Sequence, residues 1–414
     1  AQAHAQQAAG IGGWLYGNTG ELANMLSFAA TYNFTEPWYG PEKYPYNYVL
    51  RDPDQKSVST IGEANARLRL GGKSAKENAA TIVVGRQTIK QAWYLEDVVR
   101  FYNKLDQSMI GPRDVRAMQW INYEAATIQG RLAEDTVRYY GGYAWEARQI
   151  NDNEFRNLYQ AAYQTTVWPD NKKTGTSAGA SYAGIQYKPS RDMMMEGSVY
   201  VFQNMMNNAY LDFDYVFRLA DKNYFRFGTQ YMYQEGNGDN LVSGGRDFNT
   251  GYWGVYAEAR FVPWFVPYGM AGITRDGDEI RSPYSIGPSY LVQRIGENSK
   301  AGEKTWIVGG ILDFGPFHES LRGLQFDINY GHRFGRHLAG EDDQKLPNWD
   351  ELATDLIYIF PQDGFFKNLR VRARYAHVVE EGSNYNASMG RNVSGEKHTD
   401  DIRFDVGLNI PFTK

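Results

Sequence analysis

The chain has 414 residues, a formal net charge of −5 and no cysteine. The missing thiols exclude disulfide and thiolate chemistry, and the slightly acidic balance gives no electrostatic case for nucleic acid as a partner. Aromatic residues make up 15% of the chain, glycine contributes 43 residues, and no run of 18 apolar residues is present. An all-β protein is therefore expected, and a membrane-spanning helix is not.

Segments in which apolar and polar side chains alternate recur along the chain. Successive side chains of a β-strand point to opposite faces, so each segment predicts a strand with one apolar and one polar face. The clearest predicted strands cover residues 10–18, 24–34, 64–70, 137–145, 211–217, 225–233, 253–261, 306–314, 324–330, 369–375 and 401–412. We count roughly 17 candidates, whereas bacterial single-chain barrels have even strand numbers. The strand that escapes detection is expected at the N-terminus, where residues 1–9 are polar and too short to span a membrane.

The last predicted strand shows the alternation most sharply. Ile402, Phe404 and Val406 alternate with Arg403 and Asp405. A soluble β-sandwich would bury the apolar face, whereas an outer-membrane barrel would turn it toward lipid and leave the polar face in a wet lumen. In the second case Phe326 and Phe404 face lipid and Asn329 faces the lumen.

The predicted connections separate these two architectures. Short, turn-like connections at 188–192, 219–223, 315–323 and 361–368 alternate with long polar ones at 234–251, 276–304, 332–350 and 378–400. Outer-membrane barrels have short periplasmic turns and long extracellular loops, whereas a sandwich has no reason to segregate loop length by end. We therefore predict a single domain over residues 1–414, a transmembrane antiparallel β-barrel of 16–18 strands.

Two segments do not read as simple strands. The segment 90–116 is too charged for lipid and too long for a turn, so it either folds into the lumen as a constriction or forms an ordinary external loop. Its charged candidates for a constriction are Asp97, Arg100, Lys104, Asp106, Arg113 and Asp114. The segment 147–179 contains a predicted short helix around 155–163.

A row of arginines is the sharpest candidate for function. Arg370, Arg372 and Arg374 lie on one strand face about 6.6 Å apart, and Arg403 faces the same side from the next strand. Guanidinium groups hold carboxylates bidentately and keep their charge, so the row could pass an anion from site to site. The alternative is wall structure, with Asp355 and Asp405 neutralising the row. Other residues expected on the lumen wall are Arg67, Arg69, Arg138, Arg226, Glu258, Arg260 and Asp327.

Several stretches, taken in order, resemble a known family. They are residues 85–87, 280–284, 301–306, 368–375 and 401–412, and they resemble the OprD-like outer-membrane porins, the substrate-selective channels of Gram-negative bacteria. The resemblance covers residue 10 to the end. It implies a single 18-stranded barrel, narrowed by inward loops such as 90–116, with an arginine ladder on the lumen wall. It also implies passive uptake of small solutes, typically carboxylates or amino acids.

The predicted function is a passive channel in the outer membrane of a Gram-negative bacterium. Its partners would be small anionic or zwitterionic solutes, together with outer-membrane lipid and lipopolysaccharide, and both a monomer and a homotrimer stay open. The alternatives are a general diffusion porin and a structural barrel that holds a partner. No enzyme, cofactor or metal is expected, because the six histidines show neither metal-ligand spacing nor a nucleophile motif. The acidic clusters 276–279 and 341–343 are more simply solvated loops than cation sites.

Overall fold

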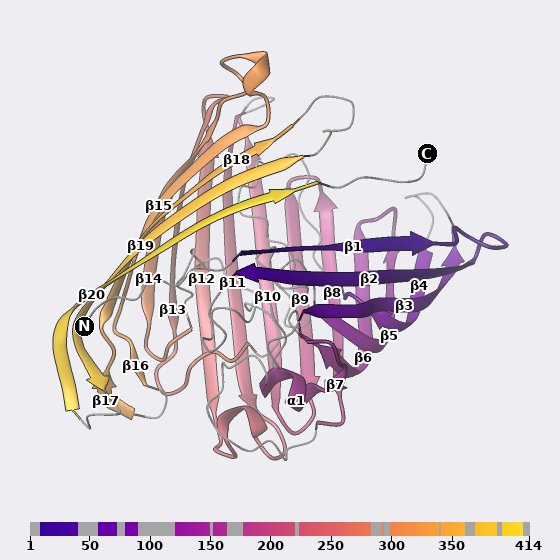
Figure 1. The fold of residues 1–414 in the computed structure, drawn as a ribbon, viewed down its shortest axis with the longest axis horizontal. Helices are drawn as coiled ribbons and strands as arrows, with labels where there is room; N and C mark the ends of the chain where they lie inside the picture. The colour runs from indigo at the N-terminus through magenta and orange to yellow at the C-terminus, as the bar shows by residue number, and fades with distance from the viewer. Residues whose placement is uncertain are drawn as a thin grey trace.

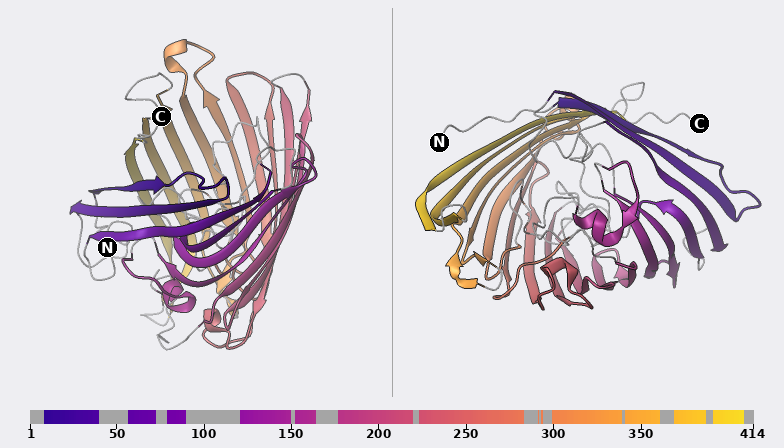
Figure 2. Two further views of the ribbon diagram at one scale, coloured as in Figure 1. Left: turned by 90° about the vertical axis from the view of Figure 1, so that its right-hand side faces the viewer. Right: turned by 60° about the horizontal axis from the view of Figure 1, so that its bottom comes forward.

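A computed structural model describes most of the chain. The described residues are 9–39, 57–72, 79–89, 121–149, 152–163, 177–219, 223–282, 291, 293, 299–338, 341–360, 369–386 and 391–408. They form one 18-stranded sheet and a small two-stranded sheet. Figure 1 and Figure 2 show that the large sheet is strongly curved, with a concave and a convex side. No helix of the described residues is long and apolar enough to cross a membrane.

The first half of the sheet consists of β1 (Ala9–Asn18), β2 (Leu26–Tyr39), β3 (Val58–Gly71), β4 (Ala79–Gln87), β5 (Asn122–Leu132), β6 (Val137–Arg148), the two-residue β7 (Arg156–Asn157), β8 (Ala180–Ser190), β9 (Met193–Phe202) and β10 (Met206–Arg218). The second half consists of β11 (Tyr224–Gly236), β12 (Asn249–Arg260), β13 (Phe265–Thr274), β14 (Lys304–Asp313), β15 (Leu324–Phe334), β18 (Asn348–Ile359), β19 (Arg370–Asn386) and β20 (Arg391–Gly407). The small sheet pairs β16 (His337–Leu338) with β17 (Glu341–Lys345).

Consecutive long strands pair antiparallel from β1 to β20, so the connections fall alternately at the two ends of the sheet. The predicted segregation of loop length is confirmed for 188–192, 219–223 and 315–323 at one end and for 234–251, 276–304 and 332–350 at the other. We call these the short-turn end and the long-loop end. The predicted loop 378–400 is wrong in extent, because β19 and β20 continue as a paired hairpin as far as Asn386 and Arg391. The predicted turn 361–368 lies outside the described residues.

The edges of the sheet agree with the strand count from the sequence. Without the two-residue β7, 17 of the 18 strands remain, and each is antiparallel to the next. The strands β1 and β20 therefore run in the same direction, from the long-loop end to the short-turn end. Within the described residues no backbone pairing joins them. The additional strand was expected in the segment 1–9. Ala9 begins β1, and residues 1–8 lie outside the described residues.

The convex face of the sheet is the apolar one. Ile402 is 78% exposed and Phe404 is 69% exposed, and the outward side chains of the other strands are mostly aromatic or aliphatic as well. A soluble protein does not expose so much contiguous apolar surface, whereas lipid solvates it. The outward orientation predicted for these residues is confirmed, and Phe326 also stays out of the concave interior.

The concave face is polar near the short-turn end and aromatic further along the strands. Inward tyrosines such as Tyr123, Tyr182 and Tyr252 form a buried cluster with Ile280, Leu291 and the helix α1 (Leu158–Tyr163). The short helix predicted around 155–163 is thus confirmed. It lies on the concave side of the sheet (Figure 2). Part of the interior is therefore filled by inward-folded segments.

The lipid-facing orientation of Phe404 gives a stability test. Phe404→Arg should lower the free energy of unfolding by about 2–4 kcal/mol, because the guanidinium would have to leave water for hydrocarbon. Phe404→Leu is the matched control, and it should cost much less because it stays apolar. Urea unfolding in lipid vesicles measures both changes. Equal and small costs for the two variants would mean that this face does not contact lipid.

Candidate functional site: charged side chains on the concave wall

The predicted arginine ladder lies on the concave face at the short-turn end. Arg374 on β19 stands directly opposite Arg403 on β20 and, on the other side, opposite Asp355 on β18. Directly opposed residues of an antiparallel pair share a face, so the predicted common orientation of the row is confirmed.

The ladder arginines are paired with carboxylates of the wall. Arg374 Nε donates to Asp355 Oδ2 at 3.1 Å, and Arg372 Nε donates to the same carboxylate at 2.8 Å. Arg370 Nη2 reaches Asp405 at 3.2 Å, and Arg403 Nη2 reaches Asp401 at 2.8 Å. Four arginines thus share three aspartates. Sequence reasoning considered Asp355 and Asp405 and did not consider Asp401. The wall pairing weighed as the alternative is present, and the role of the ladder in transport stays a prediction.

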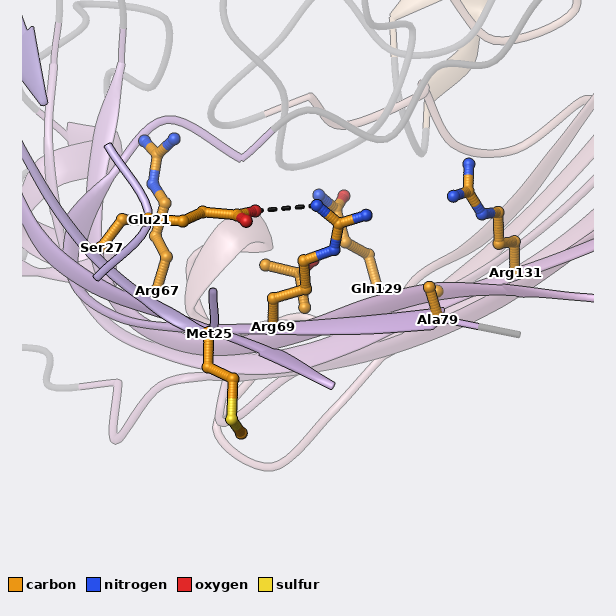
Figure 3. Close-up of a pocket in the computed structure, with 10 residues that line it drawn as sticks. Glu21, Met25, Ser27, Arg67, Arg69, Ala79, Gln129 and Arg131 are labelled. Carbon is orange, nitrogen blue, oxygen red and sulfur yellow. Dashed lines mark hydrogen bonds and ion pairs between the residues drawn. The ribbon is translucent and has the colours of Figure 1, made fainter. Parts of the chain in front are cut away.

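A second group of arginines lines a pocket of about 310 Å³ at the same end of the barrel. Arg67 and Arg69 come from β3 and Arg131 from β5, and Figure 3 shows the three guanidinium groups on one side of the wall, with Met25 pointing to the other side. Arg69 Nη1 donates to Glu21 Oε1 at 2.7 Å, and Arg67 Nε donates to Asn65 Oδ1 at 2.8 Å. This pocket contains three cationic side chains and one carboxylate among its lining residues.

Sequence reasoning expected Arg67 and Arg69 on the lumen wall, and they line this pocket, but it missed Arg131. The signal was present in the sequence, since Gln129 and Arg131 alternate with Ile128 and Leu132. Arg131 stands directly opposite Arg138 of β6. Arg138 Nε donates to Asp135 Oδ1 at 2.6 Å in the connecting turn, and this hydrogen bond lowers the pKa of Asp135.

The predicted wall residue Arg226 is buried in an ion-pair cluster. It donates two hydrogen bonds from Nη2 to Asp214, at 2.8 and 2.9 Å, and its Nη1 lies 3.8 Å from Glu258. The exposed fractions of the Arg226, Asp214 and Glu258 side chains are 3%, 0% and 1%. The guanidinium also lies over the ring of Tyr256. Arg226 and Glu258 therefore stabilise the wall and do not present their charge to a solute.

The remaining predicted wall residues also bond to the wall. Arg260 donates from Nη2 to the carbonyl of Pro263 in the next turn. Asp327 is fully buried and accepts hydrogen bonds from Tyr268 Oη at 2.8 Å and Asn329 Nδ2 at 3.1 Å. Asn329, expected in a wet lumen, is 2% exposed because Gln293 covers it. Asn329 therefore faces the concave side, as expected, but it contacts Gln293 and not a water-filled lumen.

Gln293 belongs to the connection between β13 and β14, which the sequence placed outside the barrel with the other long loops. The described residues of this connection contact the concave wall instead. Gln234 of β11 forms two hydrogen bonds of 2.8 Å with the backbone N–H and C=O of Arg281. Gln293 bonds to Arg333 and to Asn329, at 2.9 and 2.8 Å. The prediction that this connection is external is therefore wrong for these residues.

Wall glycines make room for this connection. A Cβ added to Gly272 would lie 2.5 Å from Leu291 Cδ1, and one added to Gly331 would lie 2.3 Å from Gln293 Oε1. Leu291 is completely buried in the resulting hollow. Inward-facing glycines of β13 and β15 are thus the sequence signal that sequence reasoning did not use.

In the acidic cluster 276–279, at the start of this connection, carboxylates form ion pairs with lysine and arginine. Lys300 Nζ lies 2.6 Å from Glu279 Oε2, and Arg281 Nη1 lies 2.8 Å from Glu279 Oε1. Burial acts to raise the pKa of Glu279, but Lys300 and Arg281 outweigh it, so the pKa is lowered. Asp278 pairs with Arg246 at 2.8 Å. These contacts hold the entrance of the inward connection together.

The predicted constriction 90–116 lies outside the described residues. The same holds for all six of its charged candidates, which stay predictions: Asp97, Arg100, Lys104, Asp106, Arg113 and Asp114.

The buried Arg226 cluster allows a test of its structural role. Asp214→Ala should lower the free energy of unfolding by about 3–5 kcal/mol, because it removes the bidentate partner of a desolvated guanidinium. Asp405→Ala is the matched control, since its pair with Arg370 is partly exposed and should be worth at most about 1 kcal/mol. Urea unfolding of both variants measures the difference, and a small effect of Asp214→Ala would refute the role of the cluster.

Comparison with known proteins locates the fold. No protein-family model matches the sequence. No curated protein sequence matches it either. Solved structures do match, and one is OpdK of Pseudomonas aeruginosa with vanillate, with a TM-score of 0.71 and 14% sequence identity over 97% of this chain and 92% of that chain.

Two further structures are similar. OccK2 (OpdF) of Pseudomonas aeruginosa in complex with glucuronate has a TM-score of 0.66 and 14% identity, over 92% of this chain and 85% of that chain. A BenF-like porin from Pseudomonas fluorescens Pf-5 has a TM-score of 0.70 and 13% identity, over 97% and 90%. The fold of this chain is therefore that of the OprD-like outer-membrane porins, as the resemblance of the sequence implied.

Proposed function

We propose that this protein is a passive channel of the Gram-negative outer membrane for small hydrophilic solutes, with a preference for carboxylates. The observation that supports this most directly is that two groups of side chains on the concave wall at the short-turn end have more arginines than carboxylates. The pocket of Arg67, Arg69 and Arg131 has one carboxylate among its lining residues, and the β19–β20 ladder has four arginines for three aspartates.

The chemistry of these groups suits carboxylate transfer. A guanidinium donates two parallel hydrogen bonds to a carboxylate and stays charged at every physiological pH. Arg67 and Arg69 are two residues apart on one strand, so an anion bound by one lies within a short step of the other. Conduction needs several such sites of similar strength, so that each binds the solute and still releases it.

The comparisons support the class of solute without fixing its identity. One similar porin was solved with vanillate and another with glucuronate, and both molecules contain a carboxylate. Acidic residues also face inward on the intervening strands, among them Glu196 opposite Asp212. A zwitterion such as an amino acid would therefore find both signs of charge on the wall.

The filled part of the interior helps to choose between a selective channel, a general diffusion porin and a structural barrel. The buried cluster of Leu291, Ile280 and the wall tyrosines narrows the barrel, which favours a selective channel over a general diffusion porin. The same cluster is also the observation that favours a structural barrel without conductance. Recording in planar bilayers decides between these functions, because a barrel with no single-channel current would be structural.

The arginine pocket predicts the ion selectivity of the pore. Replacing Arg67, Arg69 and Arg131 together by Gln should shift the reversal potential in a salt gradient toward cations, because the fixed positive charge near that mouth is lost. Uptake of glucuronate should fall more than uptake of glucose, a neutral sugar of similar size.

The matched comparison is the triple replacement of Arg370, Arg372 and Arg374 by Gln. These arginines already pair with Asp355 and Asp405, so we expect a smaller shift of the reversal potential and a larger loss of stability. If neither triple variant changes the reversal potential or the relative uptake, the carboxylate preference is wrong.

The inward connection predicts the conductance of the pore. Leu291→Asp should raise the single-channel current, because a carboxylate cannot stay in the apolar hollow over Gly272 and the connection would leave the wall. Phe317→Asp is the control, since it also replaces an apolar side chain by aspartate, but on an exposed turn at the short-turn end. An unchanged current in Leu291→Asp would mean that this connection does not narrow the pore.

A further inference from the structure

The outer surface of the barrel shows one arrangement of side chains twice, toward the long-loop end. In each case a tyrosine and a histidine two residues later bond to one aspartate of the next strand. Tyr375 and His377 of β19 bond to Asp400 of β20, with His377 Nδ1 and Asp400 Oδ1 2.9 Å apart. Tyr330 and His332 of β15 bond in the same way to Asp350 of β18, again with 2.9 Å between His332 Nδ1 and Asp350 Oδ1.

Both clusters lie where the lipid-facing band ends. On β20 the outward side chains change from Phe404 and Ile402 to Asp400 and His398, which is 52% exposed. A solvated carboxylate is expected at the membrane–water boundary and not within the hydrocarbon. Ions dissolved in the surrounding water can therefore reach these side chains.

The two clusters differ in what faces the second ring nitrogen of the histidine. His377 Nε2 lies 3.5 Å from Nδ1 of a second histidine, His398, and the two ring centroids are 5.5 Å apart. His398 Nε2 lies 3.6 Å from Glu396 Oε1. His332 has aromatic neighbours in place of a second imidazole, Trp306 at 6.0 Å and Phe334 at 5.3 Å between ring centroids.

In each histidine of the pair, one ring nitrogen lies beside a carboxylate and the second ring nitrogen lies beside the partner histidine. A carboxylate that accepts a hydrogen bond from one ring nitrogen leaves the lone pair on the opposite nitrogen, as it does behind metal-bound histidines. With Nδ1 of His377 donating to Asp400, the lone pair of His377 is on Nε2 and faces Nδ1 of His398 at hydrogen-bond distance. In the tautomer that carries the proton of His398 on Nε2, beside Glu396, the two lone pairs face each other, and a cation between them relieves the repulsion.

We propose that His377 and His398 bind a divalent transition-metal ion, such as Zn²⁺ or Cu²⁺. Two imidazole nitrogens that bind one ion at 2.0–2.1 Å with a tetrahedral angle are about 3.3 Å apart, close to the observed 3.5 Å. Among the described residues no three His, Asp or Glu side chains are placed to hold one ion, so water supplies the remaining ligands. The ion would join β19 to β20 at the outer rim of the barrel.

Sequence spacing could not show this pair, because 20 residues separate the two histidines in the chain. The register of the hairpin brings them together: His377 stands opposite Asp400, and His398 stands opposite Val379, so the two imidazoles are diagonal neighbours on one face. The site is independent of the proposed transport function, since it lies on the convex surface.

Zinc titration of the purified protein in detergent tests the site. The wild type should bind one Zn²⁺, and His377→Gln and His398→Gln should each lose this binding by calorimetry. Asp400→Asn should weaken it about tenfold, because it removes the carboxylate that orients His377. His332→Gln is the matched control, since it has the same tyrosine and aspartate partners without a second imidazole, and its affinity should equal that of the wild type.

Electron paramagnetic resonance of bound Cu²⁺ gives a second readout, which counts the coordinated imidazoles. Two coordinated nitrogens in the wild type and one in either single variant support the site. Heat-modifiable electrophoretic mobility reports whether each variant is a folded barrel. Wild-type affinity in His377→Gln and His398→Gln, an equal loss in His332→Gln, or no zinc binding by the wild type would each overturn the proposal.

Discussion

The antiparallel pairing of neighbouring strands is the constraint on which the rest of this structure depends. It assigns alternate side chains to lipid and to the interior, and it decides which inward charges stand side by side. Because Arg374 is opposite both Asp355 and Arg403, the ladder cannot be a row of isolated cations. The electrostatic potential that a wall arginine produces in the interior therefore depends on its cross-strand partners as well as on its own charge.

The same constraint explains why two groups of arginine at one end of the barrel differ. On β18, β19 and β20 the register places aspartates among the arginines, so ion pairs within the wall neutralise most of the positive charge. On β3 and β5 the neighbours include Thr81 and Gln129, which are neutral, and among the described residues that line the pocket the carboxylate is that of Glu21 in the first turn. The attraction of an anion should therefore be stronger beside Arg67 and Arg69 than beside the arginines of β19 and β20.

Most of the wall could be predicted from the sequence, because a period of two is a local property and needs no knowledge of the partner strand. The alternation from Ile402 to Val406 and the common face of Arg370, Arg372 and Arg374 follow from it directly. The ion pairs of Arg226 could not be predicted, because they depend on the register between β10, β11 and β12. The inward course of Gln293 depends on the absence of side chains at Gly272 and Gly331. A pattern of polar and apolar residues carries no information about side-chain size at these positions.

The axial position of the arginines has a consequence for the direction of flow. Both groups lie near the short-turn end, whereas the buried cluster of tyrosines, methionines and the inward connection lies further along the strands. A conducting pore in which these arginines leave net positive charge at one mouth gathers anions there and passes current more easily in one direction than in the other. Current–voltage curves of this barrel, inserted in a single orientation, would then be asymmetric even in identical salt solutions on the two sides.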